Sequence, residues 1–142
     1  MMIKIRFAVP EDAAELIAMN REFNEVDNLD VEAVKKKLAD GQELVVVADA
    51  GKEGLAGFCC VQHYKSFCYN RPIAELTELY VRPDYRHKGL ASRMITAQVN
   101  ALRPMGVSEL EVITAADNAQ GHAVYRANGF KDEKWSCLTR QL

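Results

Sequence analysis

The segment 73–103 constrains the fold of this chain more than any other. An apolar strand that ends at Val81 is followed by a polar loop and then by a helix. Such a loop presents free backbone N–H groups and the positive end of the helix dipole to an anion. Arg86 and Lys88 add positive charge, and Gly89 permits close approach of the backbone. The segment therefore predicts a binding site for an anion such as a diphosphate.

The rest of the chain alternates between strand-like and helix-like segments. Alternation of apolar and polar residues indicates strands, and apolar residues three or four positions apart indicate helices. The predicted strands are 3–8, 44–48, 55–63, 73–81, 107–113 and 135–142. The predicted helices are one that opens at Pro10, a second from Asp30 to Gly41, a third at about 90–103 and a fourth at 118–128. No internal repeat or linker interrupts this order, so 1–142 is expected to be a single α/β domain with a mixed sheet.

The composition excludes several classes of protein. With 142 residues, 49% of them hydrophobic, the chain can bury one core and does not have the composition of a disordered protein. Lys and Arg total 18 against 20 Asp and Glu, so the formal net charge is -2 and there is no global basic field for nucleic acid. The apolar runs are far shorter than the ~20 residues that cross a bilayer, and no secretory signal is visible. We expect a cytoplasmic protein that binds neither nucleic acid nor a membrane.

The four cysteines do not predict disulfides or a metal site. Cys59 and Cys60 are adjacent, and all four, including Cys137, lie in apolar or aromatic surroundings that suit reduced, buried thiols. Cys60, His63 and Cys68 are close in sequence, but side chains alternate along a strand, so Cys60 and His63 point to opposite faces. Structural zinc sites usually contain a C-x-x-C pair, which this sequence lacks. We therefore expect no metal.

Two short motifs carry a resemblance to a known family. Arg86, Gly89 and Ala91 form the pattern R-x-x-G-x-A, after the strand that ends at Val81. The second motif is an Asn that begins a helix, a Tyr two turns later and a Gly-Phe pair at the helix end, here Asn118, Tyr125, Gly129 and Phe130. In these motifs and in the order of its elements, over essentially its full length, the chain resembles the GNAT superfamily of N-acetyltransferases.

The resemblance implies a fold, an activity and a co-substrate. The fold would be a mixed, mostly antiparallel central sheet, splayed in its middle and flanked by helices on both faces in an α/β/α arrangement. The activity would be transfer of the acetyl group of acetyl-CoA to the primary amine of a small molecule, directly within a ternary complex and without a metal. A non-catalytic acyl-CoA-binding domain, or acetylation of a peptide N-terminus or a lysine, stay open as alternatives.

The resemblance also assigns residues to acetyl-CoA. Backbone groups of the strand should pair with the pantetheine arm as an extra strand would, and the loop and first helical turn should hold the pyrophosphate. The residues so assigned are Leu79, Tyr80 and Val81 for the arm, Arg86, His87, Lys88, Gly89, Leu90, Ala91 and Ser92 for the pyrophosphate, and Asn118. The alternative for Asn118 is an ordinary helix N-cap.

Three polar residues are candidates for the chemistry. The resemblance implies that the Tyr125 hydroxyl lies near the thioester sulfur; the alternative is a core aromatic side chain with one wet end. An alkylammonium, with a pKa of about 10, must lose a proton before it attacks a thioester, and a carboxylate in the central strand could accept that proton. Glu78 is the first candidate for this base, and Glu75 is its competitor, since a β-bulge would change the face that each occupies. A structural ion pair is the alternative for either glutamate.

The acceptor is the least constrained part of the site. Glu22, Glu25, Asp27 and Asp30 lie between the first two helices, and their acidity favours a cationic small amine. The alternative is an acidic loop that only interacts with solvent. The aromatic loop 64–69 could line the acceptor pocket or the interface of a homodimer.

Overall fold

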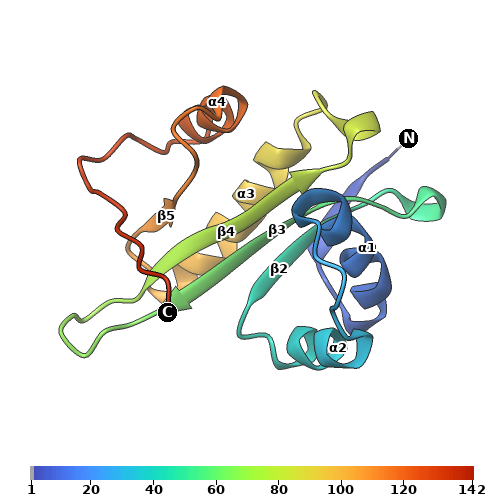
Figure 1. The fold of residues 1–142 in the computed structure, drawn as a ribbon, viewed down its shortest axis with the longest axis horizontal. Helices are drawn as coiled ribbons and strands as arrows, with labels where there is room; N and C mark the ends of the chain where they lie inside the picture. Colours follow the sequence, from blue (N-terminus) through green and yellow to red (C-terminus); the bar gives the residue numbers. More distant parts are fainter. Residues whose placement is uncertain (1) are drawn as a thin grey trace.

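A computed structural model describes residues 2–142 (Figure 1). Its strands are β1 (Lys4–Phe7), β2 (Leu44–Asp49), β3 (Leu55–Tyr64), β4 (Ile73–Val81) and β5 (Leu110–Val112). Its α-helices are α1 (Ala13–Asn24), α2 (Val31–Asp40), α3 (Leu90–Leu102) and α4 (Ala119–Ala127). Within residues 2–142, no helix is both long enough and apolar enough to cross a membrane. The order of the elements agrees with the prediction from the sequence as far as α4.

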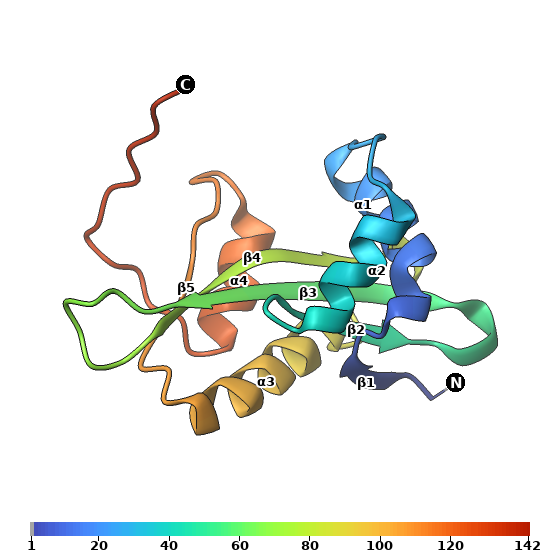
Figure 2. The same cartoon turned by 90° about the horizontal axis from the view of Figure 1, so that it is seen from below.

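The five strands form one sheet in the order β1-β2-β3-β4-β5. Neighbouring strands are antiparallel, except β4 and β5, which are parallel. Figure 2 shows α1 and α2 on one face of the sheet and α3 on the other. The predicted mixed, mostly antiparallel sheet with helices on both faces is therefore confirmed.

Each face of the sheet has its own apolar core. The core on the α3 side contains Val46, Val61, Leu76, Met94 and Ile95, together with further small side chains. The core on the α1 side contains Leu16, Met19, Val47, Phe58 and Tyr80. Because β2 and β3 are covered on both faces, their sequences are nearly continuous apolar runs rather than alternating ones.

The second helix begins and ends as the sequence predicts. The Asp30 carboxylate accepts a hydrogen bond from the N–H of Ala33 (2.9 Å) and so caps the start of α2. Gly41 follows the last residue of α2 with a φ of 69°, a left-handed conformation that glycine adopts without steric cost. The cap by Asp30 and the left-handed conformation of Gly41 each depend only on residues nearby in the sequence.

One extra residue interrupts the pairing of β4 with β3. Cys60 of β3 lies opposite Glu78, whereas the next residue of β3, Val61, lies opposite Leu76. Thr77 is therefore a bulge residue without a partner across the strands. Its hydroxyl donates to the carbonyl of Cys60 (3.3 Å), which gives the bulge a polar contact of its own.

The bulge decides which way the side chains of β4 point. Leu76 and Leu79 are three residues apart, yet both pack against the core on the α3 side. In a regular strand they would lie on opposite faces. Glu75 and Glu78 are adjacent to these leucines and point to the other face, toward α1. The bulge thus brings both candidate bases to one side of the sheet.

β4 and β5 stay together only over a short stretch. Residues 74–76 pair with Leu110–Val112, and the chain then leaves β5 in the direction of α4 (Figure 1). β4 continues to Val81, and over this last part no strand of residues 2–142 pairs with it on the β5 side. This parting of β4 from β5, the last strand of the sheet, is the predicted splay.

The prediction is wrong for the C-terminal segment. Residues 135–142, expected to be a strand, form none, and the side chains of Trp135 and Leu138 are 87% and 92% exposed. β5 is also shorter than the predicted 107–113. An alternating sequence becomes a strand only where a second strand supplies hydrogen bonds, and no strand of residues 2–142 pairs with this segment.

The cysteines fall into two groups by burial. Cys59 and Cys60 are buried as predicted, and burial raises the pKa of Cys59 to about 12. Cys68 and Cys137 were also expected to be buried, but both are exposed. They lie in the connection between β3 and β4 and in the C-terminal segment, which do not pack on either core. All four thiols are free.

Candidate active site

The open edge of β4 leaves backbone groups available to a ligand. The N–H of Arg82 donates to the carbonyl of Ala56, next to the first residue of β3 (2.8 Å). Because bonded and non-bonded positions alternate in an antiparallel pair, the N–H and C=O groups of Val81 and Leu79 point away from β3. β5 does not extend this far. An extended chain could therefore pair with these groups as an added strand does.

Beside this edge, the loop into α3 presents backbone donors. The chain turns through a short 3-10 helix, Pro83–Tyr85, and then through His87 and Gly89, whose φ angles are 62° and 76°. Gly89 is the N-cap of α3, and no side chain of residues 2–142 caps the first turn, so the first N–H groups of α3 can bind a ligand. The helix dipole adds partial positive charge at the same place. The geometry fits the diphosphate expected from the sequence.

Gly89 is required by its backbone conformation, not by crowding. A Cβ at Gly89 would meet no atom within 4 Å, but residues with side chains rarely adopt its φ of 76°. Gly106, beyond the other end of α3, has the same φ and equally open surroundings. The two glycines therefore place the same demand on the backbone and differ in their position relative to the anion site.

The basic side chains of the loop lie over aromatic rings. The Arg86 Nε donates to the carbonyl of Val81 (2.8 Å), and the guanidinium carbon lies 5.8 Å from the centre of the Tyr80 ring. The Lys88 ammonium lies 5.6 Å from the centre of the Tyr85 ring. Both arrangements are cation–π contacts, which hold a charge near an aromatic face. Two cations thus lie in the loop, one of them bonded to the open edge of β4.

The two candidates for the chemistry lie on different elements. Glu78, half-buried on β4, accepts a hydrogen bond at Oε1 from Asn24 at the end of α1 (2.9 Å). Tyr125, half-buried on α4, packs edge-on against Phe130 with 5.5 Å between ring centres. Burial raises the pKa of the Tyr125 phenol, with further contributions from Cys59 and Glu78. The phenol therefore keeps its proton throughout the neutral range.

Asn118 is the N-cap of α4. Its Oδ1 accepts from the N–H of Gly121 (3.1 Å), and its Nδ2 donates to the hydroxyl of Thr114 (2.9 Å). A Cβ at Gly121 would collide with the Asn118 side chain, so the cap depends on glycine at that position. The N-cap alternative is confirmed, and a contact between Asn118 and acetyl-CoA stays a prediction.

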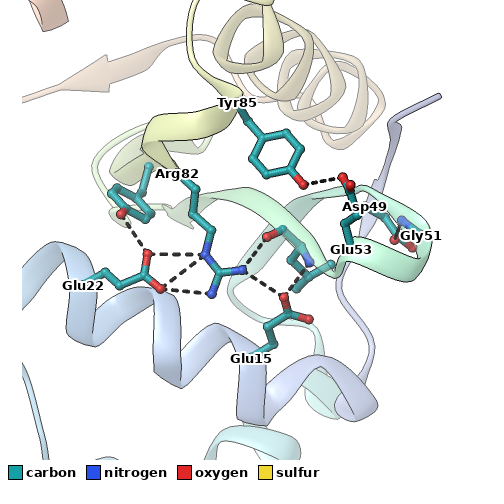
Figure 3. Close-up of polar contacts among 9 residues, drawn as sticks. Glu15, Glu22, Asp49, Gly51, Glu53, Arg82 and Tyr85 are labelled. Carbon is teal, nitrogen blue, oxygen red and sulfur yellow. Dashed lines mark hydrogen bonds and ion pairs between the residues drawn. The ribbon is translucent and has the colours of Figure 1, made fainter. Parts of the chain in front are cut away.

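A polar cluster beside β4 was not predicted from the sequence (Figure 3). Arg82, directly after β4, donates to the carboxylates of Glu15 (3.1 Å) and Glu22 (3.0 Å) on α1. Arg82 also donates to the carbonyl of Leu55 (2.8 Å), and the hydroxyl of Tyr80 donates to Glu22 (3.0 Å). These five residues, here called the α1–β4 cluster, tie α1 and the start of β3 to the end of β4.

The sequence contains half of the signal for this cluster. Glu15 and Glu22 are seven residues apart, which places them two turns apart on one face of a helix. Such a pair indicates a common cationic partner. The partner, Arg82, lies 60 residues beyond Glu22 in the sequence and comes close only in the folded chain.

The predicted acidic region between α1 and α2 has mostly structural roles. Glu22 belongs to the α1–β4 cluster, Asp30 caps α2, and Asp27 pairs with Arg21 (3.2 Å). Glu25 ends α1 in a left-handed conformation with a φ of 57°. All four acidic residues are nevertheless exposed. Their carboxylates are therefore accessible to solvent, although three of them have partners.

The remaining candidates are an aromatic loop, a metal site and His87. The aromatic side chains of Tyr64, at the end of β3, and of Phe67 and Tyr69, between β3 and β4, are exposed. Among the residues that the structure describes, no three side chains of His, Cys, Asp or Glu are grouped so that they could hold a metal ion. His87 is exposed in the loop before α3, where its φ is 62°, and its part in binding the anion stays a prediction.

Comparison with known proteins identifies the family. The model of the acetyltransferase (GNAT) family matches residues 12–130, most of the chain. The chain belongs to the GNAT acetyltransferase family. An aminoglycoside N(6')-acetyltransferase type 1 from Acinetobacter genomosp. 13 is 27% identical over 121 residues, covering 85% of this chain and 75% of the relative. A spermidine N(1)-acetyltransferase from Thermoplasma acidophilum is 32% identical over 60 residues, 42% of this chain and 37% of the relative.

Solved structures share the fold. An aminoglycoside acetyltransferase from an uncultured soil metagenomic sample, in complex with sisomicin, has a TM-score of 0.85 at 19% identity, with 99% of this chain and 96% of that chain covered. A ribosomal-protein-alanine N-acetyltransferase from Brucella melitensis biovar Abortus 2308 has a TM-score of 0.80 at 18% identity, with 99% and 100% covered. At these identities the likeness establishes the fold. The family and the named relatives support acetylation of an amine by a GNAT enzyme.

The α1–β4 cluster gives a prediction for stability against pH. The hydrogen bond from Arg82 holds the pKa of Glu22 below its ordinary value of 4.5. The contribution of the Glu22–Arg82 pair to the free energy of unfolding is therefore present above pH 4.5 and is lost as the pH falls through the lowered pKa. In Glu22→Gln, the free energy of unfolding should decline less than in the wild type between about pH 6 and pH 3. Urea unfolding at a series of pH values measures this. Glu25→Gln, which removes an acid outside the cluster, should keep the wild-type decline; a wild-type decline in Glu22→Gln as well would contradict the assignment.

Proposed function

We propose that this chain transfers the acetyl group of acetyl-CoA to the primary amine of a small molecule, in a direct reaction within a ternary complex. One observation carries the proposal: the open edge of β4 lies next to the uncapped start of α3. The edge suits an extended arm, and the helix start suits a diphosphate. CoA contains both groups in one molecule, and membership of the GNAT family points to the same donor.

The residues assigned to acetyl-CoA have distinct roles in this proposal. Leu79 and Val81 offer backbone N–H and C=O groups to the pantetheine arm, whereas those of Tyr80, also assigned to the arm, point to Phe58 of β3. Residues 87–92 offer N–H groups to the diphosphate, and Arg86 offers its side chain, because its own N–H donates to the carbonyl of Pro83 (3.3 Å). The Arg86 side chain holds the Val81 carbonyl, so pairing of that carbonyl with the arm requires Arg86 to turn. The diphosphate gives the guanidinium a stronger, charge-assisted partner.

Glu78 and Tyr125 divide the proton transfers in the proposed reaction. Acetyl-CoA supplies the acetyl group as a thioester. Glu78 accepts the proton that the amine must lose to become a nucleophile. As the C–N bond forms and the C–S bond breaks, Tyr125 donates its proton to the departing sulfur, and its raised pKa keeps that proton available. The nitrogen then loses its second proton, which restores the Tyr125 phenol, and Glu78 releases the first proton to solvent. Glu75, on the same face of the sheet, and an ordered water are the alternatives for the base.

The proposed acceptor is a small cationic amine. Relatives are named for aminoglycosides and for spermidine, and the exposed acidic residues between α1 and α2 attract cations. The test is a panel containing an aminoglycoside, a polyamine and a peptide with a free N-terminus, assayed for release of the CoA thiol. Release with the peptide alone would change the acceptor class. No release with any amine, while calorimetry still detects acetyl-CoA binding, would favour a non-catalytic acyl-CoA-binding domain.

The anion site predicts a loss of acetyl-CoA binding in Gly89→Trp. A bulky side chain at Gly89 blocks approach of the diphosphate to the backbone and removes charge-assisted hydrogen bonds of about 1.5–3 kcal/mol each, so the affinity should fall at least about tenfold. Isothermal titration calorimetry measures it. Gly106→Trp is the matched control, because it imposes the same φ strain in equally open surroundings. Equal affinities in the two variants would refute the site.

The leaving-group role predicts that Tyr125→Phe lowers kcat and leaves acetyl-CoA affinity nearly unchanged. The variant keeps the ring that packs against Phe130 and removes only the hydroxyl. The expected loss in kcat is about 10²–10⁴-fold, the usual contribution of a positioned acid or base. Steady-state kinetics with the amine found in the panel, together with calorimetry for acetyl-CoA, measure the two quantities. A fully active variant would mean that the thiolate leaves without an acid.

The base role predicts a pH-dependent loss in Glu78→Gln. Glutamine keeps the shape of the side chain but accepts no proton, so kcat/KM should be low at neutral pH and should recover as the pH rises and free amine becomes abundant. A purely structural Glu78 would give a loss independent of pH. The profile of kcat/KM against pH is compared with that of Glu75→Gln. A wild-type profile in Glu78→Gln, with the pH-dependent loss in Glu75→Gln, would transfer the role to Glu75.

A homodimer and a cytoplasmic location complete the proposal. Exposed apolar side chains occur in the C-terminal segment and in the loop between β3 and β4, at Trp135, Leu138, Phe67 and Tyr69. Such side chains are typical of protein–protein interfaces. Sedimentation at high protein concentration should therefore give a species of twice 15.9 kDa. A single species of 15.9 kDa would exclude the dimer.

A further inference from the structure

Asn24, the last residue of α1, makes two side-chain hydrogen bonds at once. Its Nδ2 donates to Oδ1 of Asn20 (2.7 Å) and to Oε1 of Glu78 (2.9 Å). One amide NH2 group has two hydrogens, so both are used. Turning the Asn24 amide around would place its oxygen against two acceptors. The orientation of the Asn24 side chain is therefore fixed by its two partners.

This contact leaves the carboxylate of Glu78 with one engaged oxygen and one available oxygen. Among residues 2–142, Oε1 accepts from Asn24 and Oε2 accepts from no side chain or backbone group. We propose that Asn24, oriented by Asn20, is a positioning residue that holds Glu78 so that Oε2 receives the proton of the acceptor amine. This inference rests on the proposed role of Glu78 as the base.

A neutral amide is a partner that suits a base. A guanidinium or ammonium next to a carboxylate lowers its pKa strongly and makes it a poor proton acceptor. An amide donor orients the carboxylate without adding a permanent positive charge. Asn24 is itself held in place by the end of α1, where the N–H of Glu25 donates to the carbonyl of Arg21 (3.0 Å).

The other groups around Glu78 do not replace this contact. Cys60 of β3 is kept neutral, because burial raises its pKa well above the usual value, and Tyr125 of α4 is neutral for the same reason. Charged groups on this side of the sheet include Glu75 of β4, the carboxylates and guanidinium of Glu15, Glu22 and Arg82, and the Arg21–Asp27 and Lys37–Glu43 ion pairs. None of these donates a hydrogen bond to Glu78 within residues 2–142.

The test is the profile of kcat/KM against pH for Asn24→Asp, with the amine that the panel identifies. A second carboxylate beside Glu78 disfavours ionisation of the pair, so the acid limb of the profile should move up by about one pH unit or more. Asn28→Asp is the matched control: it adds the same charge in the exposed connection to α2, four residues from Asn24, without a contact to Glu78. Its acid limb should stay at the wild-type position.

Asn24→Ala provides a second test that does not depend on an added charge. Loss of the positioning contact should lower kcat about 10- to 100-fold with an unchanged KM for acetyl-CoA. A cooperative urea unfolding curve should show that the variant is folded. In Glu78→Gln, adding Asn24→Ala should cost nothing further, because the two residues act as one unit.

The outcomes separate this inference from the proposed function. If Glu78→Gln shows the pH-dependent loss while Asn24→Asp and Asn24→Ala both behave as wild type, only the positioning role of Asn24 is overturned. If Glu78→Gln keeps the wild-type profile, or if no amine in the panel is acetylated, the base role fails and this inference fails with it. A shift of the acid limb in Asn28→Asp equal to that in Asn24→Asp would show a general charge effect and would also overturn it.

Discussion

At Thr77, β4 has one residue more than β3 has opposite it, and several features of the candidate site follow from that residue. A bulge bends and twists the strand that contains it. β5 pairs with β4 only on the near side of the bulge, so the strand beyond it has a free edge. The same extra residue turns Glu75 and Glu78 to one face. The free edge for a donor molecule and the carboxylates for an acceptor thus have a single structural origin.

A free strand edge is useful for binding only if the strand is held in place, and the α1–β4 cluster does this. Arg82 reaches two other elements, α1 and the start of β3, with a side chain that is 23% exposed, so its ion pairs are partly shielded from water. Pairs of this kind in a network contribute more than isolated surface pairs. Because the cluster fixes α1 at Glu15 and Glu22, it also fixes Asn24, two residues further along the helix.

The sequence predicts the features that depend on near neighbours and misses those that depend on distant ones. Asp30 and Gly41 bound α2 through local backbone geometry, and both were recognised. The start of α3 was predicted correctly because the polar loop, its glycine and the helix start are consecutive. The segment 135–142 has a strand-like pattern, but no strand of residues 2–142 pairs with it, so the prediction of a strand there was wrong. Arg82 was missed because its partners lie 60 and 67 residues away.

Glu22 on α1 and Glu78 on β4 illustrate how the hydrogen-bond partner of a carboxylate decides what that carboxylate can do. Glu22 accepts from the guanidinium of Arg82, which lowers its pKa and keeps it ionised, so it holds elements together and is a poor proton acceptor. Glu78 accepts from an uncharged amide and retains one oxygen without a partner among residues 2–142. The residue type is the same and the composition of the chain does not distinguish the two. Their difference arises from which donor the fold brings to each, and on that ground we assign Glu22 to stability and propose Glu78 for the chemistry.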